Sequence, residues 1–336
     1  MKYRKLGRTD LELSEVGFGV WTVSTGWWGK IEPADGEKLL QQALELGVTF
    51  FDTADTYGLG VGEEILAKAF HDHRHEIVIG TKFGYDWYTN QERTGHQERP
   101  QKWEPDFIRY ACEQSLRRLQ TDYIDLYQLH NPRLDTIQRD EIFETLDDLV
   151  REGKLRHYGI AIGPDIGWED EGMASMQERD IESLQIIYSA LEQQPARNFF
   201  PAAEKANTGL LSRVPHASEV LTDDFVAKKP SFDADDHRAH RRQQWLESAM
   251  KKREQVVFMA SETGRTLSQA AIQFCLSEPS IASVLPNIVR LDQLAELAAS
   301  SETPPLENDE LEYLRERFDE NFGLERLPEE TLRSSR

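Results

Sequence analysis

The sequence has few cysteines and no long apolar segment. Its two cysteines, Cys112 and Cys275, are too few for a disulfide framework or for a metal site built from several thiolates. No run of residues approaches the roughly eighteen apolar positions of a transmembrane helix, so we do not expect an integral membrane protein. The first ten residues are basic, but no apolar stretch follows them. We therefore expect no signal peptide and a cytoplasmic location.

Positive charge is also scarce. Sixty acidic residues outnumber thirty-nine basic ones, which gives a formal net charge of −21, and lysine is half as frequent as arginine. Because a protein that binds the phosphate backbone needs a basic face, we do not expect nucleic acid as a partner. Solvated acidic faces explain this charge in an ordinary acidic protein, and adaptation to high salt is the alternative that the composition leaves open.

Aromatic residues, by contrast, are plentiful, and they exclude wholesale disorder. The 336 residues include 7 Trp, 15 Phe and 10 Tyr, whereas disordered chains have few aromatic and apolar residues. No segment rich in proline, glycine or serine divides the chain. Residues 1–336 are therefore predicted to form a single domain.

Short apolar strands alternate with amphipathic helices along almost the whole chain. After an opening hairpin of Tyr3–Leu6 and Leu11–Ser14, the pattern predicts eight strand–helix units with one extra helix before the last strand. Such alternation indicates an α/β protein with a parallel sheet, and eight units predict a closed (β/α)8 TIM barrel. The glycines of residues 57–62 do not fit the G-x-G-x-x-G fingerprint of an open, doubly wound sheet. The predicted strands are Val16–Val20, Val48–Asp52, Ile77–Thr81, Tyr123–Leu129, Arg156–Ile162, Ser183–Tyr188, Gly209–Val214 and Ile281–Leu285.

Two long polar stretches, residues 84–104 and 221–240, stand outside this alternation. Loops of such length in a compact domain are usually functional or disordered, and the aromatic residues embedded in both favour ordered lids. Between the second stretch and the last strand, we expect a long helix over residues 241–263 and another over residues 267–276.

Four titratable residues follow the predicted strands at their carboxyl ends. Asp52 ends the second strand, and Tyr57 follows it by five residues. Lys82 and His130 come directly after the third and fourth strands. The carboxyl ends of barrel strands share one rim, which is where active sites form. Each residue alone has an ordinary structural explanation, but their occurrence at three adjacent strand ends favours a common site.

The chemistry of these side chains fits proton transfer to an oxygen that becomes an alkoxide. A phenol ordinarily has a pKa of about 10, and a neighbouring ammonium makes it a stronger acid by favouring the phenolate. We expect Lys82 to act in this way on Tyr57, while Asp52 keeps Lys82 charged. His130 is predicted to bind the substrate carbonyl, and a hydride from elsewhere completes the reduction. An isomerase or lyase that uses Lys82 as a Schiff base is an alternative, which requires a neutral, desolvated lysine.

Several motifs in this order resemble the aldo-keto reductase superfamily. They are Leu6-Gly7-Arg8-Thr9, Glu15-Val16-Gly17-Phe18-Gly19, Phe51–Gly58, Gly80-Thr81-Lys82, Asp122–His130, Ser283–Pro286 and Asp292-Gln293-Leu294. The resemblance covers nearly the whole chain and implies an (α/β)8 barrel, a nicotinamide cofactor bound without a Rossmann fold, and carbonyl reduction. On matching positions it implies Tyr57 as the general acid, tuned by Asp52 and Lys82, with His130 orienting the carbonyl. The alternative is a non-catalytic, reductase-like regulatory or binding subunit that senses the redox state of nicotinamide.

The resemblance also implies cofactor contacts, from which the sequence departs at several positions. Gln185 matches a glutamine that helps to hold the carboxamide, but the usual Ser-Asn pair is here Ala161-Ile162. Arg213 stands where an aromatic residue usually stacks on nicotinamide, and a guanidinium plane can stack there too. Arg290 is the basic residue left to meet a 2′-phosphate, so NADPH is the predicted cofactor and NADH the alternative. The other implied contacts are Pro215, Gln293 and Glu296, with Lys228, Lys229, Arg238 and Arg241 as candidates for the phosphates and Asn287 and Ile288 as further departures.

Aromatic residues near the same rim indicate the substrate class. Those predicted to line the pocket are Trp21, Trp28, Trp87 and Tyr88, with Trp27 and Trp103 nearby. Such a mouth suits an apolar or aromatic aldehyde or ketone, and the resemblance adds sugars and small aldehydes as alternatives. We expect no metal, because His71–His75 lie in a helix-to-strand turn at the opposite face. The sequence leaves a monomer and a homo-oligomer equally open.

Overall fold

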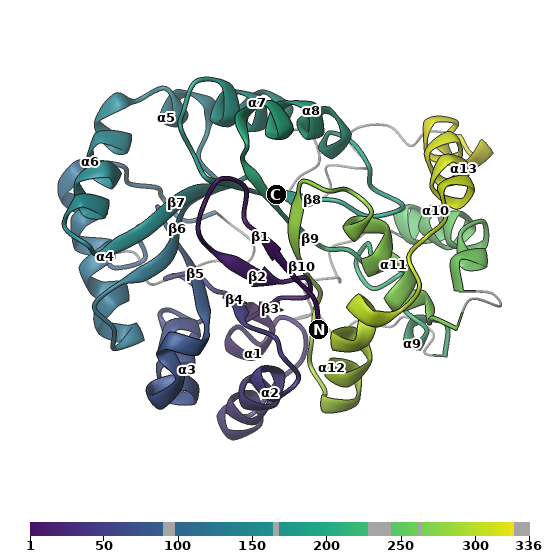
Figure 1. The fold of residues 1–336 in the computed structure, drawn as a ribbon, viewed down its shortest axis with the longest axis horizontal. Coiled ribbons are helices and arrows are strands. Elements are labelled where there is room, and N and C mark those ends of the chain that lie inside the picture. The colour runs from purple at the N-terminus through teal and green to yellow at the C-terminus, as the bar shows by residue number, and fades with distance from the viewer. Residues whose placement is uncertain (90–97, 164–167, 228–242, 261–263, 326–336) are drawn as a thin grey trace.

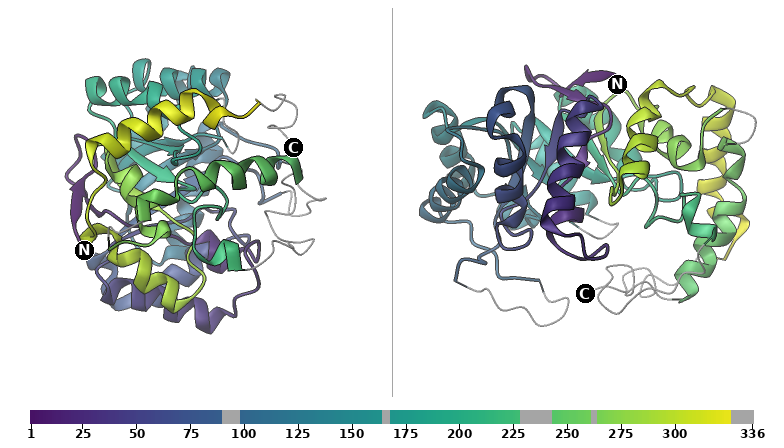
Figure 2. Two further views of the ribbon diagram at one scale, coloured as in Figure 1. Left: turned by 90° about the vertical axis from the view of Figure 1, so that its right-hand side faces the viewer. Right: turned by 90° about the horizontal axis from the view of Figure 1, so that it is seen from below.

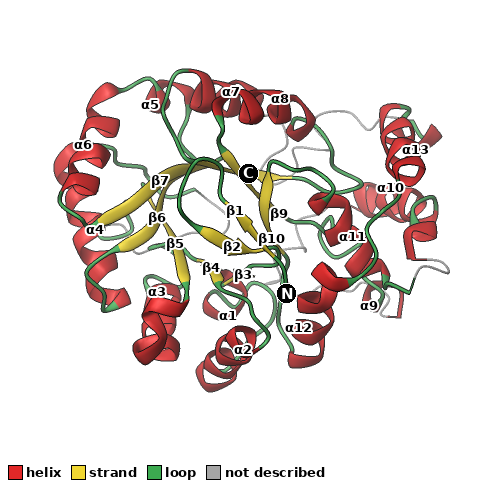
Figure 3. Ribbon diagram, in the orientation of Figure 1, coloured by secondary structure: helices red, strands yellow, loops and turns green. Residues whose placement is uncertain are grey.

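Eight parallel strands form a barrel in the computed structural model, which describes residues 1–89, 98–163, 168–227, 243–260 and 264–325 (Figures 1 and 3). Each strand pairs with the next one along the chain, from β3 to β10. A parallel bridge between Val16 and Val284 closes the ring, since the amide of Gly17 donates to the Val284 carbonyl at 2.9 Å. The strands are β3 (Phe18–Gly19), β4 (Phe50–Asp52), β5 (Val78–Phe83), β6 (Ile124–His130), β7 (Leu155–Ala161), β8 (Ser183–Ile187), β9 (Gly209–Arg213) and β10 (Ile281–Leu285).

Helices surround this barrel on all sides (Figure 2). They are amphipathic: α6, for example, buries Ile142, Phe143, Leu146 and Leu149 against the strands and exposes its acidic residues. Prolines begin α2 and α4, where the missing amide hydrogen is not needed. The helices are α1 (Trp21–Ser24), α2 (Pro33–Glu45), α3 (Val61–Phe70), η1 (His71–Glu76), α4 (Pro105–Leu119), α5 (Leu134–Ile137), α6 (Asp140–Arg151), α7 (Glu169–Gln177), α8 (Ala196–Ala206), α9 (Asp224–Ala227), α10 (Gln243–Glu254), η3 (Val257–Ala260), α11 (Leu267–Leu276), α12 (Leu291–Ala298), η4 (Ala299–Glu302), α13 (Asn308–Asp319) and η5 (Asn321–Gly323).

An N-terminal hairpin covers the amino-terminal end of the barrel (Figure 1). Its strands, β1 (Tyr3–Lys5) and β2 (Glu12–Ser14), pair in antiparallel fashion, as predicted. Leu6, Leu11 and Leu13 are at most 1% exposed. They form one apolar cluster with barrel residues, among them Phe50, Leu126, Leu211 and Ala282. The hairpin therefore seals the barrel interior at the end opposite to the strand carboxyl termini.

The same hairpin is tied to the last third of the chain. The Arg4 guanidinium donates to the carbonyl oxygens of Leu276, Glu278 and Ile281, at 2.9, 3.4 and 3.1 Å. The N-terminal amine lies 3.1 Å from the carboxylate of Glu302 in η4. Residues almost three hundred positions apart thus hold each other in place.

The predicted architecture is confirmed: the hairpin, the eight units and the extra helix before the last strand are all present. Two helices differ from expectation. The long helix expected over residues 241–263 ends at Glu254, because the chain turns there to bury Val256 and continues as η3. Helix α13 was not predicted, because its one fully buried residue, Leu314, lies among acidic and basic residues that obscure the helical period. No helix in the described part of the chain is long and apolar enough to cross a membrane.

We expect truncation of the hairpin's apolar cluster to destabilise the whole barrel. Leu13→Ala removes a fully buried side chain and leaves a cavity, which should lower the free energy of unfolding by about 2–5 kcal/mol. Leu46→Ala, at a position that is 36% exposed, is the control and should change it by about 0.5 kcal/mol or less. Urea titration followed by circular dichroism measures both, and equal losses in the two variants would contradict this role of the hairpin.

Candidate active site at the carboxyl ends of the strands

A buried ion pair lies inside the barrel near the carboxyl ends of its strands. Asp52 ends β4, and Lys82 lies in the adjacent strand β5, where Asp52 faces Gly80 in the register. The Lys82 Nζ atom is 2.5 Å from Asp52 Oδ2 and donates to the Thr53 carbonyl at 2.7 Å. Lys82 and Asp52 are only 1% and 4% exposed, so solvent screens their attraction weakly.

Two glutamine amides complete the surroundings of the Asp52 carboxylate. Gln128 in β6 and Gln185 in β8 both donate to Asp52 Oδ1 at 3.0 Å. A buried ion pair persists only where further hydrogen bonds satisfy its remaining atoms, and these amides supply them. The inward residues of four strands are therefore joined through one carboxylate.

Tyr57 and His130 stand above this pair. The Lys82 Nζ atom lies 5.0 Å from the centre of the Tyr57 ring, and this ring and that of His130 are nearly perpendicular, with their centres 5.8 Å apart. The turn that carries Tyr57 depends on Gly58, which has a φ of +60° and whose added Cβ would lie 2.2 Å from the Ser24 carbonyl oxygen. The structure thus brings Asp52, Tyr57, Lys82 and His130 together.

His130 ends β6 and is kept uncharged by its environment. Burial, reinforced by the positive charges of Lys82 and Arg213, lowers its pKa well below the usual value for histidine. Within the described part of the chain, its buried Nδ1 atom has no hydrogen-bond partner. A neutral imidazole can donate one hydrogen bond to a carbonyl oxygen without competing with Lys82 as a cation.

Tyr85 is a site residue that the sequence analysis did not single out. Its ring meets His130 edge-on with the centres 5.0 Å apart, and its hydroxyl accepts from Asn131 Nδ2 at 2.8 Å and donates to Glu98. Burial and the Glu98 carboxylate raise the pKa of Tyr85 far above its usual range, so it remains a phenol. Its position three residues after Lys82 is the one feature of the sequence that could have indicated this role. The loop contains four aromatic residues, however, and the sequence does not show which of them contacts His130.

The aromatic residues predicted to line the substrate pocket form two separate groups. Trp21 packs on Trp28 and Trp27, with ring centres 5.5 and 6.3 Å apart. Trp87 stacks on Tyr88 at 4.4 Å, and both rings lie against the Arg118 guanidinium of α4. Trp87 and Tyr88 thus serve the packing of their loop on α4, whereas Tyr85 from the same loop is the ring that contacts His130.

The residues predicted to contact the nicotinamide, at what we call the reacting end of the cofactor path, carry polar groups that can bind its carboxamide. Gln185, the middle residue of β8, has a buried amide whose nitrogen donates to Asp52. Arg213 at the end of β9 donates to the carbonyl oxygens of Ile162 and Gly163 at 2.8 and 2.6 Å, so its guanidinium is held against the backbone that follows β7. Ala161 and Ile162, between them, offer no side-chain hydrogen bond. These residues fit a nicotinamide with fewer hydrogen bonds than a Ser-Asn pair would supply.

The predicted phosphate and adenosine contacts have protein partners of their own. The Arg290 guanidinium lies 2.6 Å from Asp224 and 3.1 Å from Asp292, and these carboxylates raise its pKa. Gln293 accepts from the Val289 amide at 3.0 Å, and Glu296 accepts from the Thr266 hydroxyl at 2.5 Å. Pro215 is buried, while Lys228, Lys229, Arg238 and Arg241 lie outside the described residues. This end therefore fits a phosphate group less well than the reacting end fits a nicotinamide.

The histidine-rich turn is separate from this site. His71 and His73 lie in η1 and contact the carboxylates of Asp72 and Glu76 at 3.0 and 2.8 Å, respectively. Across the described ranges, no group of three or more potential metal ligands is arranged to hold an ion.

Known proteins match the chain over almost its full length. The sequence model of the Aldo/keto reductase family matches residues 15–318. An uncharacterized oxidoreductase of Bacillus subtilis, YqkF, is 31% identical over 94% of this chain and 96% of its own. The holo form of aldo-keto reductase AKR11C1 from Bacillus halodurans superposes with a TM-score of 0.75 at 28% identity, covering 94% of this chain and 96% of its own. A probable voltage-gated potassium channel subunit beta of rice, Oryza sativa, is 24% identical over 91% of this chain and 93% of its own.

We predict that His130 makes stability depend on pH in a defined direction. Because its pKa is lower in the folded state than in the unfolded state, the unfolded chain takes up the proton first, and stability is lost as the pH falls below about 6.5. Between about pH 7.5 and 5.5 this contributes roughly 1 kcal/mol, which His130→Gln should remove. Urea midpoints at the two pH values test this, with the exposed His71→Gln as control. An unchanged slope in His130→Gln would contradict the prediction.

Proposed function

Because the chain belongs to the aldo/keto reductase family and is an NAD(P)H-dependent oxidoreductase, we propose that it reduces an aldehyde or ketone carbonyl with Tyr57 as the proton donor. The observation that carries this proposal is the position of Lys82, paired with Asp52 at 2.5 Å and 5.0 Å from the Tyr57 ring. The same residues can catalyse the reverse oxidation of an alcohol.

The roles of the residues follow from their charges and contacts. A bound reduced nicotinamide supplies the hydride for the carbonyl carbon. Tyr57 gives its phenolic proton to the carbonyl oxygen, and the nearby ammonium of Lys82 stabilises the phenolate that remains. Asp52 positions Lys82 and holds it in its charged form.

His130 is the residue proposed to orient the substrate carbonyl. It is neutral, it faces the edge of Tyr57, and Tyr85 fixes its ring from another side. A hydrogen bond from His130, next to the proton donor Tyr57, places the carbonyl oxygen of the substrate between these two side chains. Such positioning raises the reaction rate, because the entropy lost in aligning the carbonyl with the proton donor is lost on binding and not in the transition state.

The substrate class follows from the aromatic residues near the mouth. Trp21 packs on Trp28 just after the carboxyl end of β3, and Tyr85 lies against His130, so flat apolar rings are present at this end of the barrel. Such a lining suits an apolar or aromatic aldehyde or ketone. Sugars remain the second class to screen, since stacking on aromatic rings suits their apolar faces as well.

A second candidate function is that of a regulatory or binding subunit that senses nicotinamide redox state without turnover. Two observations favour it: the likeness to a protein named as a probable potassium channel subunit, and the absence of side-chain hydrogen bonds from Ala161 and Ile162. Slow turnover with tight cofactor retention would support this role. The Lys82–Asp52 pair, by contrast, argues against a Schiff-base lyase, which needs a neutral amine.

Tyr57→Phe tests the proton donor. We expect reduction to fall by about two to four orders of magnitude, the usual span for loss of a general acid, because no other phenol or acid takes over the transfer. Dinucleotide binding, measured by fluorescence titration, should stay near the wild-type value. Tyr110→Phe, at an exposed position on α4, is the control. If Tyr57→Phe keeps most of its activity, another group donates the proton.

Arg290→Ala tests the proposed preference for NADPH. Hydrogen bonds to a charged group are worth about 1.5–3 kcal/mol, so NADPH affinity should fall about tenfold or more while NADH affinity changes little. Arg109→Ala is a matched control, because the Arg109 guanidinium also binds two carboxylates, Asp148 and Glu152, but on the outer face of α4. Equal weakening of both dinucleotides would remove the basis for this preference.

A further inference from the structure

A buried carboxylate lies between the loops that follow the last two barrel strands. Glu219 comes after β9 and Asn287 after β10, and Asn287 Nδ2 donates to Glu219 Oε1 at 2.6 Å. The two residues are 8% and 5% exposed. The Glu219 side chain is therefore held at a defined position by a partner from the neighbouring loop.

The backbone around Glu219 has an unusual conformation. Ala217, Ser218 and Glu219 have φ values of +47°, +57° and +72°, in the left-handed region that favours glycine. Hydrogen bonds hold this turn: the Thr222 amide and hydroxyl both donate to the Glu219 carbonyl, at 3.1 and 2.8 Å. Such conformations persist only where the surroundings enforce them, and they occur preferentially at functional sites.

Within the part of the chain that the structure describes, the cation bound to this turn, Arg253, donates to the carbonyl oxygens of Val220 and Thr222 and not to the Glu219 carboxylate. Its hydrogen-bond partner is a neutral amide, and none of the ion pairs between described residues includes it. The nearest acidic residues along the chain, Asp223 and Asp224, accept from the Leu267 amide and from Arg290. Burial of a carboxylate without a cation is unfavourable, so its retention at this place calls for a role.

The position of the Glu219 carboxylate in the barrel indicates which ligand it affects. In (β/α)8 barrels, the loops after the seventh and eighth strands commonly form the site for a phosphate group. Counted around this barrel, β9 and β10 are the seventh and eighth strands. A negative charge held in these loops by Asn287 repels an anion that binds there, by an interaction that burial strengthens.

We infer that Glu219 acts as a built-in competitor for the phosphate groups of the nicotinamide dinucleotide, so that it sets the affinity of the enzyme for its cofactor. Binding requires the carboxylate to leave Asn287, whose amide then becomes available to a phosphate oxygen. This inference rests on the proposed function, since it presupposes that the dinucleotide extends from the reacting end to these loops.

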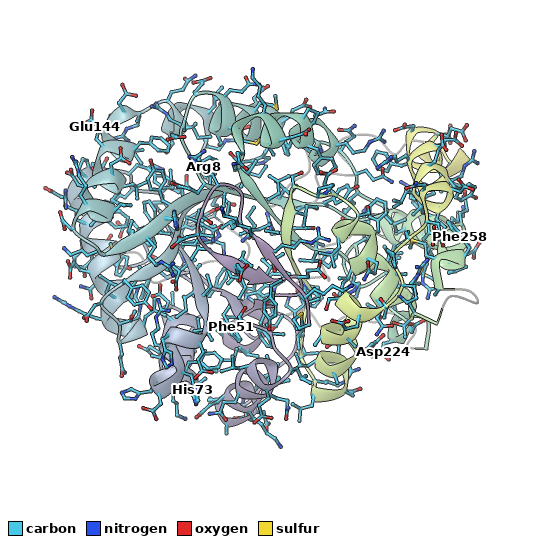
Figure 4. All side chains as sticks on the ribbon, viewed as in Figure 1. Arg8, Phe51, His73, Glu144, Asp224 and Phe258 are labelled. Atoms are coloured by element: carbon cyan, nitrogen blue, oxygen red, sulfur yellow. The ribbon has the colours of Figure 1, made fainter. Side chains whose placement is uncertain are left out.

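Three variants separate charge from backbone conformation. Glu219→Gln keeps the shape and can still accept from Asn287, but it removes the charge. Glu219→Gly removes the charge and also suits the left-handed φ. Glu144→Gln removes one charge from the exposed face of α6, far from Asp224 and the loops after β9 and β10, and controls for net charge (Figure 4). Fluorescence titration with NADPH and with NADH gives the dissociation constant of each protein without recourse to activity.

We expect Glu219→Gln to bind both dinucleotides about tenfold or more tightly than the wild type, which corresponds to about 1.4 kcal/mol, with Glu144→Gln unchanged. Tightening in Glu219→Gly alone assigns the effect to the backbone and overturns the inference, as does equal affinity of the wild type and Glu219→Gln. Binding by Glu219→Gln but not by the wild type supports it in its strongest form. If none of the proteins binds either dinucleotide, the proposed function fails, and the inference fails with it.

Discussion

The ion pair between Lys82 and Asp52 is the interaction on which the site depends. Two buried charges are costly to remove from water, and they are tolerated here because Gln128, Gln185 and the Thr53 carbonyl satisfy the remaining atoms. These contacts come from strands β4, β5, β6 and β8, so a shift of any one strand would break the arrangement. The pair therefore fixes the barrel register and places a positive charge beneath Tyr57 at the same time. Its positive charge also adds to the effect of burial, which is the main reason why the pKa of His130 is low and its imidazole neutral.

Much of this arrangement was predictable, because parallel strands of a barrel place their carboxyl ends at one rim. Asp52, Lys82 and His130 stand at the ends of adjacent strands, and their convergence follows from topology alone. Contacts that depend on loop conformation were not predictable. Tyr85, rather than Trp87 or Tyr88, meets His130 because the loop after β5 folds two of its rings onto α4. The contacts of Arg290 with Asp224 and of Glu296 with Thr266 were hidden as well, since each joins segments 30 or more positions apart in the sequence.

The two ends of the proposed cofactor path differ in their charge. The reacting end combines one satisfied ion pair with neutral donors and the Arg213 guanidinium, which is engaged by backbone carbonyls. At the phosphate end, each basic or acidic group of the described residues already has a protein partner, as Arg290 has in Asp224 and Asp292. A ligand there must exchange partners with the protein rather than fill an open site. Affinity for the cofactor thus depends on the contacts that the cofactor makes and on the contacts within the protein that it replaces. A substitution that changes either set of contacts changes the affinity.

The N-terminal hairpin has a consequence for how this barrel is made. Arg4 and the amino group of Met1 bind groups of residues 276–302, which lie 272 or more positions further along the chain. The hairpin can pair its own strands and meet Phe50 and Leu126 early, but its contacts with Leu211 and Ala282 require most of the chain. Contacts between such distant positions form slowly, because closing a long loop is entropically unfavourable. Closure of the ring between Val16 and Val284 is therefore a late step of folding, and the apolar face of the hairpin is fully covered only at that stage.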